Sequence, residues 1–159
     1  RGLGDVYKRQ FLTIAVLTQL AGVLGSLLSG NLGQTYGTYI KPPLSPPGWL
    51  FGIVWPVLYL LMSIAFYIVS QQEPKTKFHK TASVLYWTQL FVNFLWPIVF
   101  FRLKWYWVSV GIIVLLDILV LLTLLWFYKI KKPAGHFMLS YLLWILFATY
   151  LNTGIALLN

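Results

Sequence analysis

The sequence predicts an all-α membrane protein built as a bundle of five transmembrane helices. Its 159 residues are 59% hydrophobic and only 9% charged, and the mean hydropathy is +0.77. A typical soluble domain carries about 25% charged residues, so this chain lacks the polar side chains to cover a globular surface. The few charges also leave uncharged stretches long enough to cross a bilayer. The composition therefore excludes a soluble enzyme and a disordered chain.

Five segments reach the length of about 20 mostly apolar residues that a transmembrane helix needs at about 1.5 Å of rise per residue. The fourth segment contains a single charged residue, Asp117, and the other four contain none. The apolar stretches lack the alternation that a membrane β-barrel shows. Because little chain remains outside them, we predict one domain over residues 11–159. Its helices span residues 11–29, 49–70, 81–101, 105–128 and 135–157.

The first ten residues, RGLGDVYKRQ, differ from the rest of the chain. They are polar, they begin with arginine rather than methionine, and the apolar pattern starts directly after them. We interpret residues 1–10 as an extraneous segment from cloning or sequence assembly, and we leave their charges out of the topology. The alternative is a genuine basic flank of the first helix.

Lysine and arginine residues in the connections predict how the chain crosses the membrane. The connections after the second and fourth helices share one side with the N-terminus and hold six lysines, against Lys41, Arg102 and Lys104 on the other side. The positive-inside rule therefore predicts the N-terminus inside, in the cytoplasmic membrane of a bacterium. These flanking residues account for the net charge of +9, so we expect no nucleic acid partner. The six lysines are Lys75, Lys77, Lys80, Lys129, Lys131 and Lys132.

The first connection, residues 30–48, is longer than the others and contains four prolines and four glycines. Proline fixes its own backbone and disfavours helix in the residue before it. We therefore expect a stiff, irregular cover over one end of the bundle. Long ordered connections of this kind are more often functional lids than simple linkers.

Aromatic and amide side chains recur at helical spacing inside three of the predicted helices. Residues four apart lie on one face of a helix, and a small residue between a tryptophan and an asparagine would leave room for a planar ligand. Trp55, Trp96 and Trp144 lie several residues inside their helices, whereas tryptophans of the membrane interface lie near helix ends. Ordinary packing is the alternative to a ligand pocket. The rows are Phe51, Trp55 and Tyr59; Gln89, Asn93 and Trp96; and Trp144, Ala148 and Asn152.

Groups suited to catalysis or metal binding are scarce. The chain has no cysteine, and His79 and His136 lie at helix ends near lysines, so the sequence indicates no metal site and no cofactor. Asp117 lies at the centre of the fourth helix, where an acid is costly and often functional. A protonated carboxyl group hydrogen-bonded to a neighbouring helix is an equal alternative. Pro56 and Pro97 predict kinks in the second and third helices.

Three segments in order carry a family resemblance that covers about residues 11–158. They read KPPLSPPGWLFGIVWPVLY at 41–59, QLFVNFLWPIVFF at 89–101 and SYLLWILFATYLN at 140–152. The chain resembles the TspO/MBR family of tryptophan-rich sensory proteins and translocator proteins, also called peripheral-type benzodiazepine receptors. The resemblance implies five membrane helices around a pocket capped by the first connection. It also implies binding of porphyrins such as protoporphyrin, of sterols in animal members, and of benzodiazepine-type drugs.

The resemblance further implies a set of pocket residues from the first connection and three helices. Trp55 and Trp144 would face the porphyrin, and they would be the catalytic residues if the protein degrades porphyrin with light and oxygen. The implied ligand-binding residues are Tyr36, Pro46, Phe51, Trp55, Tyr59, Asn93, Trp96, Trp144 and Ala148.

Our leading interpretation is an integral membrane receptor or sensor that binds tetrapyrroles inside the helix bundle. The alternatives are a light- and oxygen-dependent porphyrin-degrading enzyme and a small transporter of porphyrin or lipid-like ligands. The expected partners are a porphyrin or another hydrophobic small molecule and the lipid bilayer. The chain could form a homodimer, but we assign no interface to it. Ser83 and Trp87 do not form the small-residue pair through which some family members dimerise.

The chain departs from the family pattern at three places. Leu44 stands where the family usually has a tryptophan, which we expect to thin the aromatic cover of the pocket. The family's aspartate in the fourth helix falls at or beside Gly111, so Asp117 inherits no role from it. No lysine or arginine follows Lys132, which argues against the sterol-recognition tail of animal members.

Overall fold

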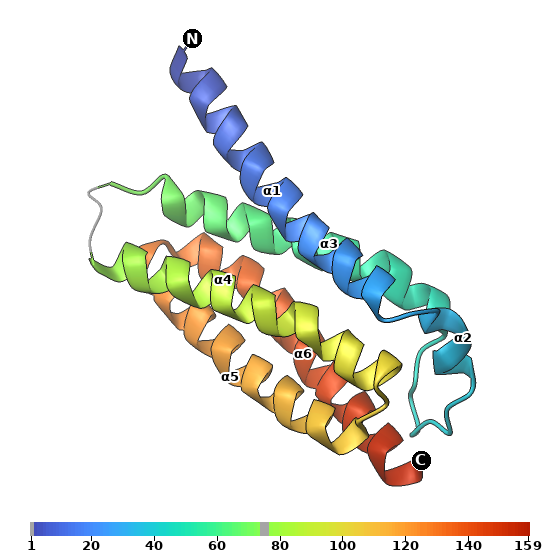
Figure 1. Ribbon diagram of the computed structural model, residues 1–159. Helices are drawn as coiled ribbons and strands as arrows, with labels where there is room; N and C mark the ends of the chain where they lie inside the picture. Colours follow the sequence, from blue (N-terminus) through green and yellow to red (C-terminus); the bar gives the residue numbers. More distant parts are fainter. Residues whose placement is uncertain (1, 74–76) are drawn as a thin grey trace.

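The computed structural model describes residues 2–73 and 77–159 and forms a bundle of long helices (Figure 1). Five helical stretches are long and apolar enough to cross a membrane, which confirms the predicted fold class. The elements are α1 (Gly2–Leu28), α2 (Leu32–Gly37), α3 (Gly48–Ser70), α4 (Lys77–Pro97), the π-helix η1 (Ile98–Arg102), α5 (Tyr106–Ile130) and α6 (Lys132–Leu158).

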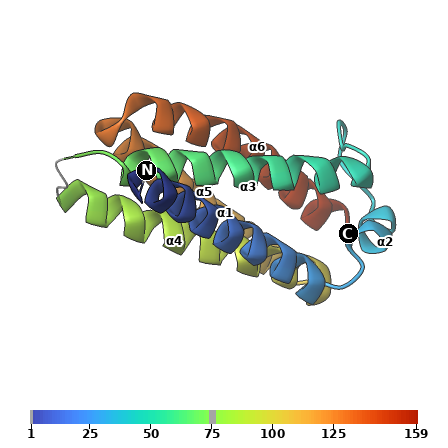
Figure 2. The same ribbon diagram turned by 90° about the horizontal axis from the view of Figure 1, so that it is seen from above.

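The two ends of the bundle differ. The short helix α2, the connection from η1 to α5 and the end of α6 lie at one end. The end of α3, the start of α4 and the α5–α6 connection lie at the other (Figure 1). Helix α1 packs mainly on α3 and α4 (Figure 2), and its first turns project beyond the other helices (Figure 1). Only 17% of its apolar 18-residue stretch is buried inside the bundle, against 28–39% of the corresponding stretches in the other four helices. Helix α1 is therefore the peripheral member of the bundle.

Two elements near the start of the chain, α1 and α2, differ from the prediction. Helix α1 begins at Gly2, so residues 2–10 continue it, and the extraneous origin of residues 1–10 stays a prediction. The first connection contains the helix α2, which the sequence analysis missed. Asn31 caps this helix, because its Oδ1 accepts a hydrogen bond from the Gln34 backbone N–H at 3.1 Å. Of the six lysines used for topology, Lys75 lies outside the described residues.

The expected kink at Pro97 takes the form of a change in helix type. Proline lacks a backbone N–H and cannot continue the regular hydrogen-bond ladder. Helix α4 ends there, and the next residues form the π-helix η1, in which the Leu103 N–H donates to the Ile98 carbonyl at 3.0 Å. Such wide turns often occur at functional sites. Here the wide turn directs Phe100 and Phe101 toward the end of the bundle that holds α2.

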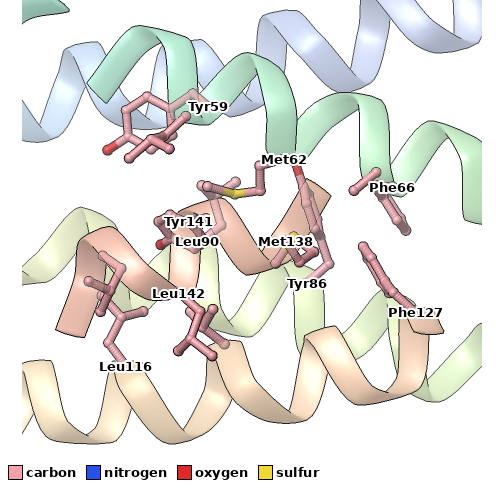
Figure 3. Packing of buried hydrophobic residues seen from close by; sticks show 14 of the residues in the cluster. Tyr59, Met62, Phe66, Tyr86, Leu90, Leu116, Phe127, Met138, Tyr141 and Leu142 are labelled. Carbon is pink, nitrogen blue, oxygen red and sulfur yellow. The ribbon is translucent and has the colours of Figure 1, made fainter. Parts of the chain in front are cut away.

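The half of the bundle away from α2 is tightly packed with aromatic and aliphatic side chains (Figure 3). The ring of Phe66 stacks on that of Tyr86 with centroids 4.3 Å apart, and both stack on Phe127 at 6.1 Å. Met62 and Met138 are fully buried in the same cluster. Because the late part of α3 and the early parts of α4 and α6 fill this half, any internal space must lie in the other half.

Helices α5 and α6 approach each other closely at Gly135. A Cβ on this glycine would lie 2.8 Å from Tyr128 Cβ and 3.0 Å from Tyr128 Cα. The neighbouring backbone cannot move out of the way without separating the two helices. Glycine at this position is therefore a packing requirement.

We predict that Gly135→Ala lowers the free energy of unfolding by about 1–3 kcal/mol, the usual effect of overpacking. The matched control is Gly111→Ala in α5, where a Cβ would meet nothing within 4 Å. Alanine favours helix over glycine by about 1 kcal/mol, so this control should keep or raise stability. Thermal unfolding of both variants in detergent micelles measures the difference, and a Gly135→Ala variant as stable as the parent would contradict the close packing.

Candidate ligand-binding cavity

A cavity of about 480 Å³ occupies the half of the bundle next to α2. Its walls come from α1, α3, α4 with η1, and α6, and α2 lies over one side. The volume falls within the range of about 300–1,000 Å³ that is typical of small-molecule sites. The aromatic residues that line it are Tyr36, Phe51, Trp55, Tyr59, Trp96, Phe100 and Phe101.

Seven of the nine residues that the family resemblance implied line this cavity; Pro46 and Trp144 do not. Pro46 instead accepts a hydrogen bond at its carbonyl from the Tyr36 hydroxyl at 2.7 Å. Trp144 packs edge-on against Trp55, with ring centroids 6.3 Å apart, and against Phe51 at 5.7 Å. The structure thus places Trp144 behind the cavity wall, and only Trp55 of this tryptophan pair lines the cavity. Contact of these residues with a ligand stays a prediction. The seven are Tyr36, Phe51, Trp55, Tyr59, Asn93, Trp96 and Ala148.

A chain of buried hydrogen bonds forms the inner end of the cavity and joins α3, α4 and α6. The Tyr59 hydroxyl donates to Asn93 Oδ1 at 2.6 Å, and Asn93 Nδ2 donates to the Tyr141 hydroxyl at 2.6 Å. The Tyr141 hydroxyl donates in turn to Gln89 Oε1 at 3.0 Å. Inside a bilayer no water is at hand to satisfy these groups, so each must find its partner within the protein. The chain therefore fixes the relative positions of the three helices.

A second polar contact fixes the orientation of Trp96. Its Nε1 donates to Asn152 Oδ1 at 2.7 Å, and Asn152 Nδ2 donates to Ser109 Oγ at 3.1 Å. The indole also stacks on Phe100, with centroids 5.3 Å apart and an interplanar angle of 15°. The polar ends of these side chains are thus bound to each other. What remains for a ligand is mostly aromatic and aliphatic surface.

The first connection, whose helix α2 lies over the cavity, is bound to the C-terminal part of the chain. The Tyr150 hydroxyl donates to the Pro43 carbonyl at 2.6 Å, and Asn159 pairs with both backbone groups of Ile40, at 3.2 and 2.8 Å. A Cβ on Gly154 would lie 2.5 Å from Pro42 Cγ, so Pro42 packs directly against this glycine. The connection is therefore an ordered lid rather than a loose loop.

Two side chains of this lid, Tyr36 and Leu44, differ in burial. Burial raises the pKa of the Tyr36 phenol, so this group keeps the proton that it donates to Pro46. Leu44 is 84% exposed and does not line the cavity.

Helix α1 also contributes to the cavity wall, which we did not predict from the sequence. Gln19, Gly22 and Ser26 line the cavity from this helix, and Gln19 Nε2 donates to the Pro56 carbonyl at 3.0 Å. Gly22 has no room for a side chain, because the Tyr59 ring occupies the place of a Cβ. The signal was available, since these three residues are spaced by three and four and therefore share one face of the helix.

Asp117 lies outside the cavity, between α5 and α6. Its Oδ2 is 2.7 Å from the Thr149 hydroxyl, so it has the hydrogen bond to a neighbouring helix that one of the two interpretations required. Among the described residues, no three histidine, aspartate or glutamate side chains come together as a metal site.

A second, shallower hollow of about 380 Å³ lies between α1 and α4. It is almost entirely apolar, and Leu17, Leu20 and Phe91 in its wall are exposed on the outer surface of the bundle. This groove contains no amide or hydroxyl side chain to orient a ligand.

We predict that Asn93→Leu lowers the free energy of unfolding by about 1–3 kcal/mol, because it leaves buried phenol groups without their partner. Adding Tyr59→Phe to this variant removes the orphaned hydroxyl and should recover part of the loss. Unfolding in detergent micelles of both single variants and the double variant gives the coupling between the two sites. Losses that simply add would contradict the hydrogen bond.

Comparison with known proteins identifies the family of the chain. Residues 14–158 match the model of the TspO/MBR family. The tryptophan-rich protein TspO of Archaeoglobus fulgidus is 41% identical over 150 residues, which cover 93% of this chain and 96% of that protein. The protein of the same name from Chlorobaculum tepidum is 36% identical, covering 95% and 98%, and the translocator protein of Bos taurus is 30% identical, covering 86% and 82%. The chain therefore belongs to the TspO/MBR family and is an integral, multi-pass membrane protein.

Proposed function

We propose that the cavity binds a flat hydrophobic tetrapyrrole such as protoporphyrin, and that the protein acts as a membrane receptor or sensor for it. The observation that carries this proposal is the aromatic lining. Phe51, Trp55 and Trp96 line one cavity and come from two different helices. Aromatic rings stack well on a flat conjugated ligand, and the fixed indole of Trp96 adds little entropy cost on binding.

The character of the cavity supports a hydrophobic ligand over a polar one. No carboxyl, imidazole or amine group lines it, and its amide side chains are already bonded to the protein. A polar ligand would lose its bonds to water there without replacing them. The family resemblance, which implies porphyrins and benzodiazepine-type drugs, points to the same class of ligand.

The enzyme alternative rests on the position of Trp55. Its indole lies in the wall and contacts the rings of Tyr59, at 5.8 Å, and Trp144. An electron-rich indole next to a bound porphyrin is the group most readily oxidised under light and oxygen. The transporter alternative has less support, because Asp117, the acid that coupling would require, lies outside the cavity.

The orientation in the membrane belongs to the same proposal. With the lysine-rich α3–α4 and α5–α6 connections inside, the lid and the cavity lie toward the outer face of a bacterial cytoplasmic membrane. A ligand would then be received from the outer face or from the bilayer.

We predict that Ala148→Phe weakens protoporphyrin binding about 5- to 150-fold, equivalent to about 1–3 kcal/mol, because the larger ring fills the cavity. Ala148 is buried and lines the cavity. Leu146→Phe on the same helix is the control, since Leu146 is 48% exposed on the outer surface. Fluorescence titration of the purified variants measures both affinities. Unchanged binding by Ala148→Phe would exclude this cavity as the site.

A second prediction separates binding from photochemistry. Trp55→Phe keeps an aromatic ring, so affinity should fall by no more than about tenfold, equivalent to about 1.4 kcal/mol. Formation of any porphyrin product under light should fall much further, because phenylalanine is hard to oxidise. Trp126→Phe is the control, since Trp126 packs on Phe78 at the far end of the bundle. Absorption time courses in light and darkness measure the product. Equal losses of product formation in the two variants would contradict the enzyme alternative.

A further inference from the structure

The charged residues near the cavity are all of one sign. Among the described residues, the acids are Asp5 in the first turns of α1, Glu73 after the end of α3 and Asp117 within α5. None of these segments belongs to the end of the bundle that holds the lid (Figure 1). Lys41, Arg102 and Lys104 do lie at that end. The charged side chains at the lid end of this uncharged cavity are therefore all positive.

Two of these cations lie next to α2, and one of them contacts a residue that lines the cavity. Lys41 is half-buried, and its Nζ lies 4.9 Å from the ring centroid of Tyr36 while donating to the Tyr39 carbonyl at 3.2 Å. Arg102 follows Phe101 in the chain, and its Nη1 lies 4.0 Å from the place of a Cβ on Gly30. These two cations thus lie beside the two chain ends of α2, whose Leu32 and Tyr36 line the cavity.

The positions of the two cations restrict how an amphipathic acid could bind. Burying a carboxylate in the aromatic interior would cost several kcal/mol, because no cationic side chain lines the cavity to pair with it. At the lid end the same carboxylate could stay partly hydrated and pair with an ammonium or guanidinium group, and the guanidinium can bind it with two parallel bonds. The apolar body of the ligand would then fill the cavity.

We propose that Lys41 and Arg102 form a carboxylate subsite, so that the protein selects flat hydrophobic ligands with acid groups along one edge. This inference rests on the proposed function, since it assumes that the aromatic cavity holds the body of the ligand. It adds the chemical class and the orientation: the acidic edge lies under the lid, and the opposite edge lies against Tyr59 and Asn93.

The test compares protoporphyrin with its dimethyl ester, which has the same ring but no charge. Both are titrated in a non-ionic detergent, so that no anionic lipid competes for the cations. We expect the acid to bind more tightly than the ester to the parent protein, and we expect Lys41→Gln and Arg102→Gln each to weaken binding of the acid about fivefold. Binding of the ester should stay within about twofold, because partly exposed charge pairs contribute only modestly and only to the charged ligand. High salt should remove the preference for the acid.

Lys104→Gln is the matched control. Lys104 has the same charge at the same end of the bundle, but neither it nor its chain neighbours Leu103 and Trp105 line the cavity. It should change neither affinity. Equal binding of acid and ester by the parent, or equal weakening of both ligands by Lys41→Gln and Arg102→Gln, would overturn the subsite while leaving the cavity as the binding site. Saturable binding of neither ligand would overturn the proposed function itself.

Discussion

The hydrogen-bond chain from Tyr59 through Asn93 and Tyr141 to Gln89 is the interaction on which the rest of the structure depends. Lipid tails are as apolar as leucine, so apolar contact alone does little to fix how transmembrane helices pack. A buried amide that needs two specific partners is far more selective. This chain of hydrogen bonds holds α3, α4 and α6 in one arrangement. The contacts of Trp96 with Asn152 and of Asn152 with Ser109 join α5 to it.

The two halves of the bundle follow from this arrangement. On one side of these hydrogen bonds, the aromatic stack of Phe66, Tyr86 and Phe127 fills the space between the helices. On the other side, the helices enclose the cavity. Helix α1 closes the outer wall with few polar ties, among them the contact of Thr18 with the Tyr86 hydroxyl at 2.6 Å. A rigid frame with one peripheral helix and a tied lid suits a protein that encloses a hydrophobic molecule within the membrane.

Much of this architecture could be predicted from the sequence, because helix length in a membrane is set by bilayer thickness and charges mark the ends. The rows through Trp55, Asn93 and Ala148 were found because helical spacing fixes which residues share a face. The position of Trp144 could not be found in this way, since helix rotation decides whether a ring lines a cavity or lies behind another ring. The helix α2 was hidden by the surrounding prolines and glycines, although Asn31 gave a capping signal.

The central claim is that the space between α1, α3, α4 and α6 is the ligand site. The measurement that tests it most directly is an experimental structure of the protein with protoporphyrin bound. We expect the macrocycle beneath the lid and in contact with Trp55 and Trp96. Trp144 should lie behind Trp55. A macrocycle bound instead in the outer groove between α1 and α4, against Leu20 and Phe91, would contradict it.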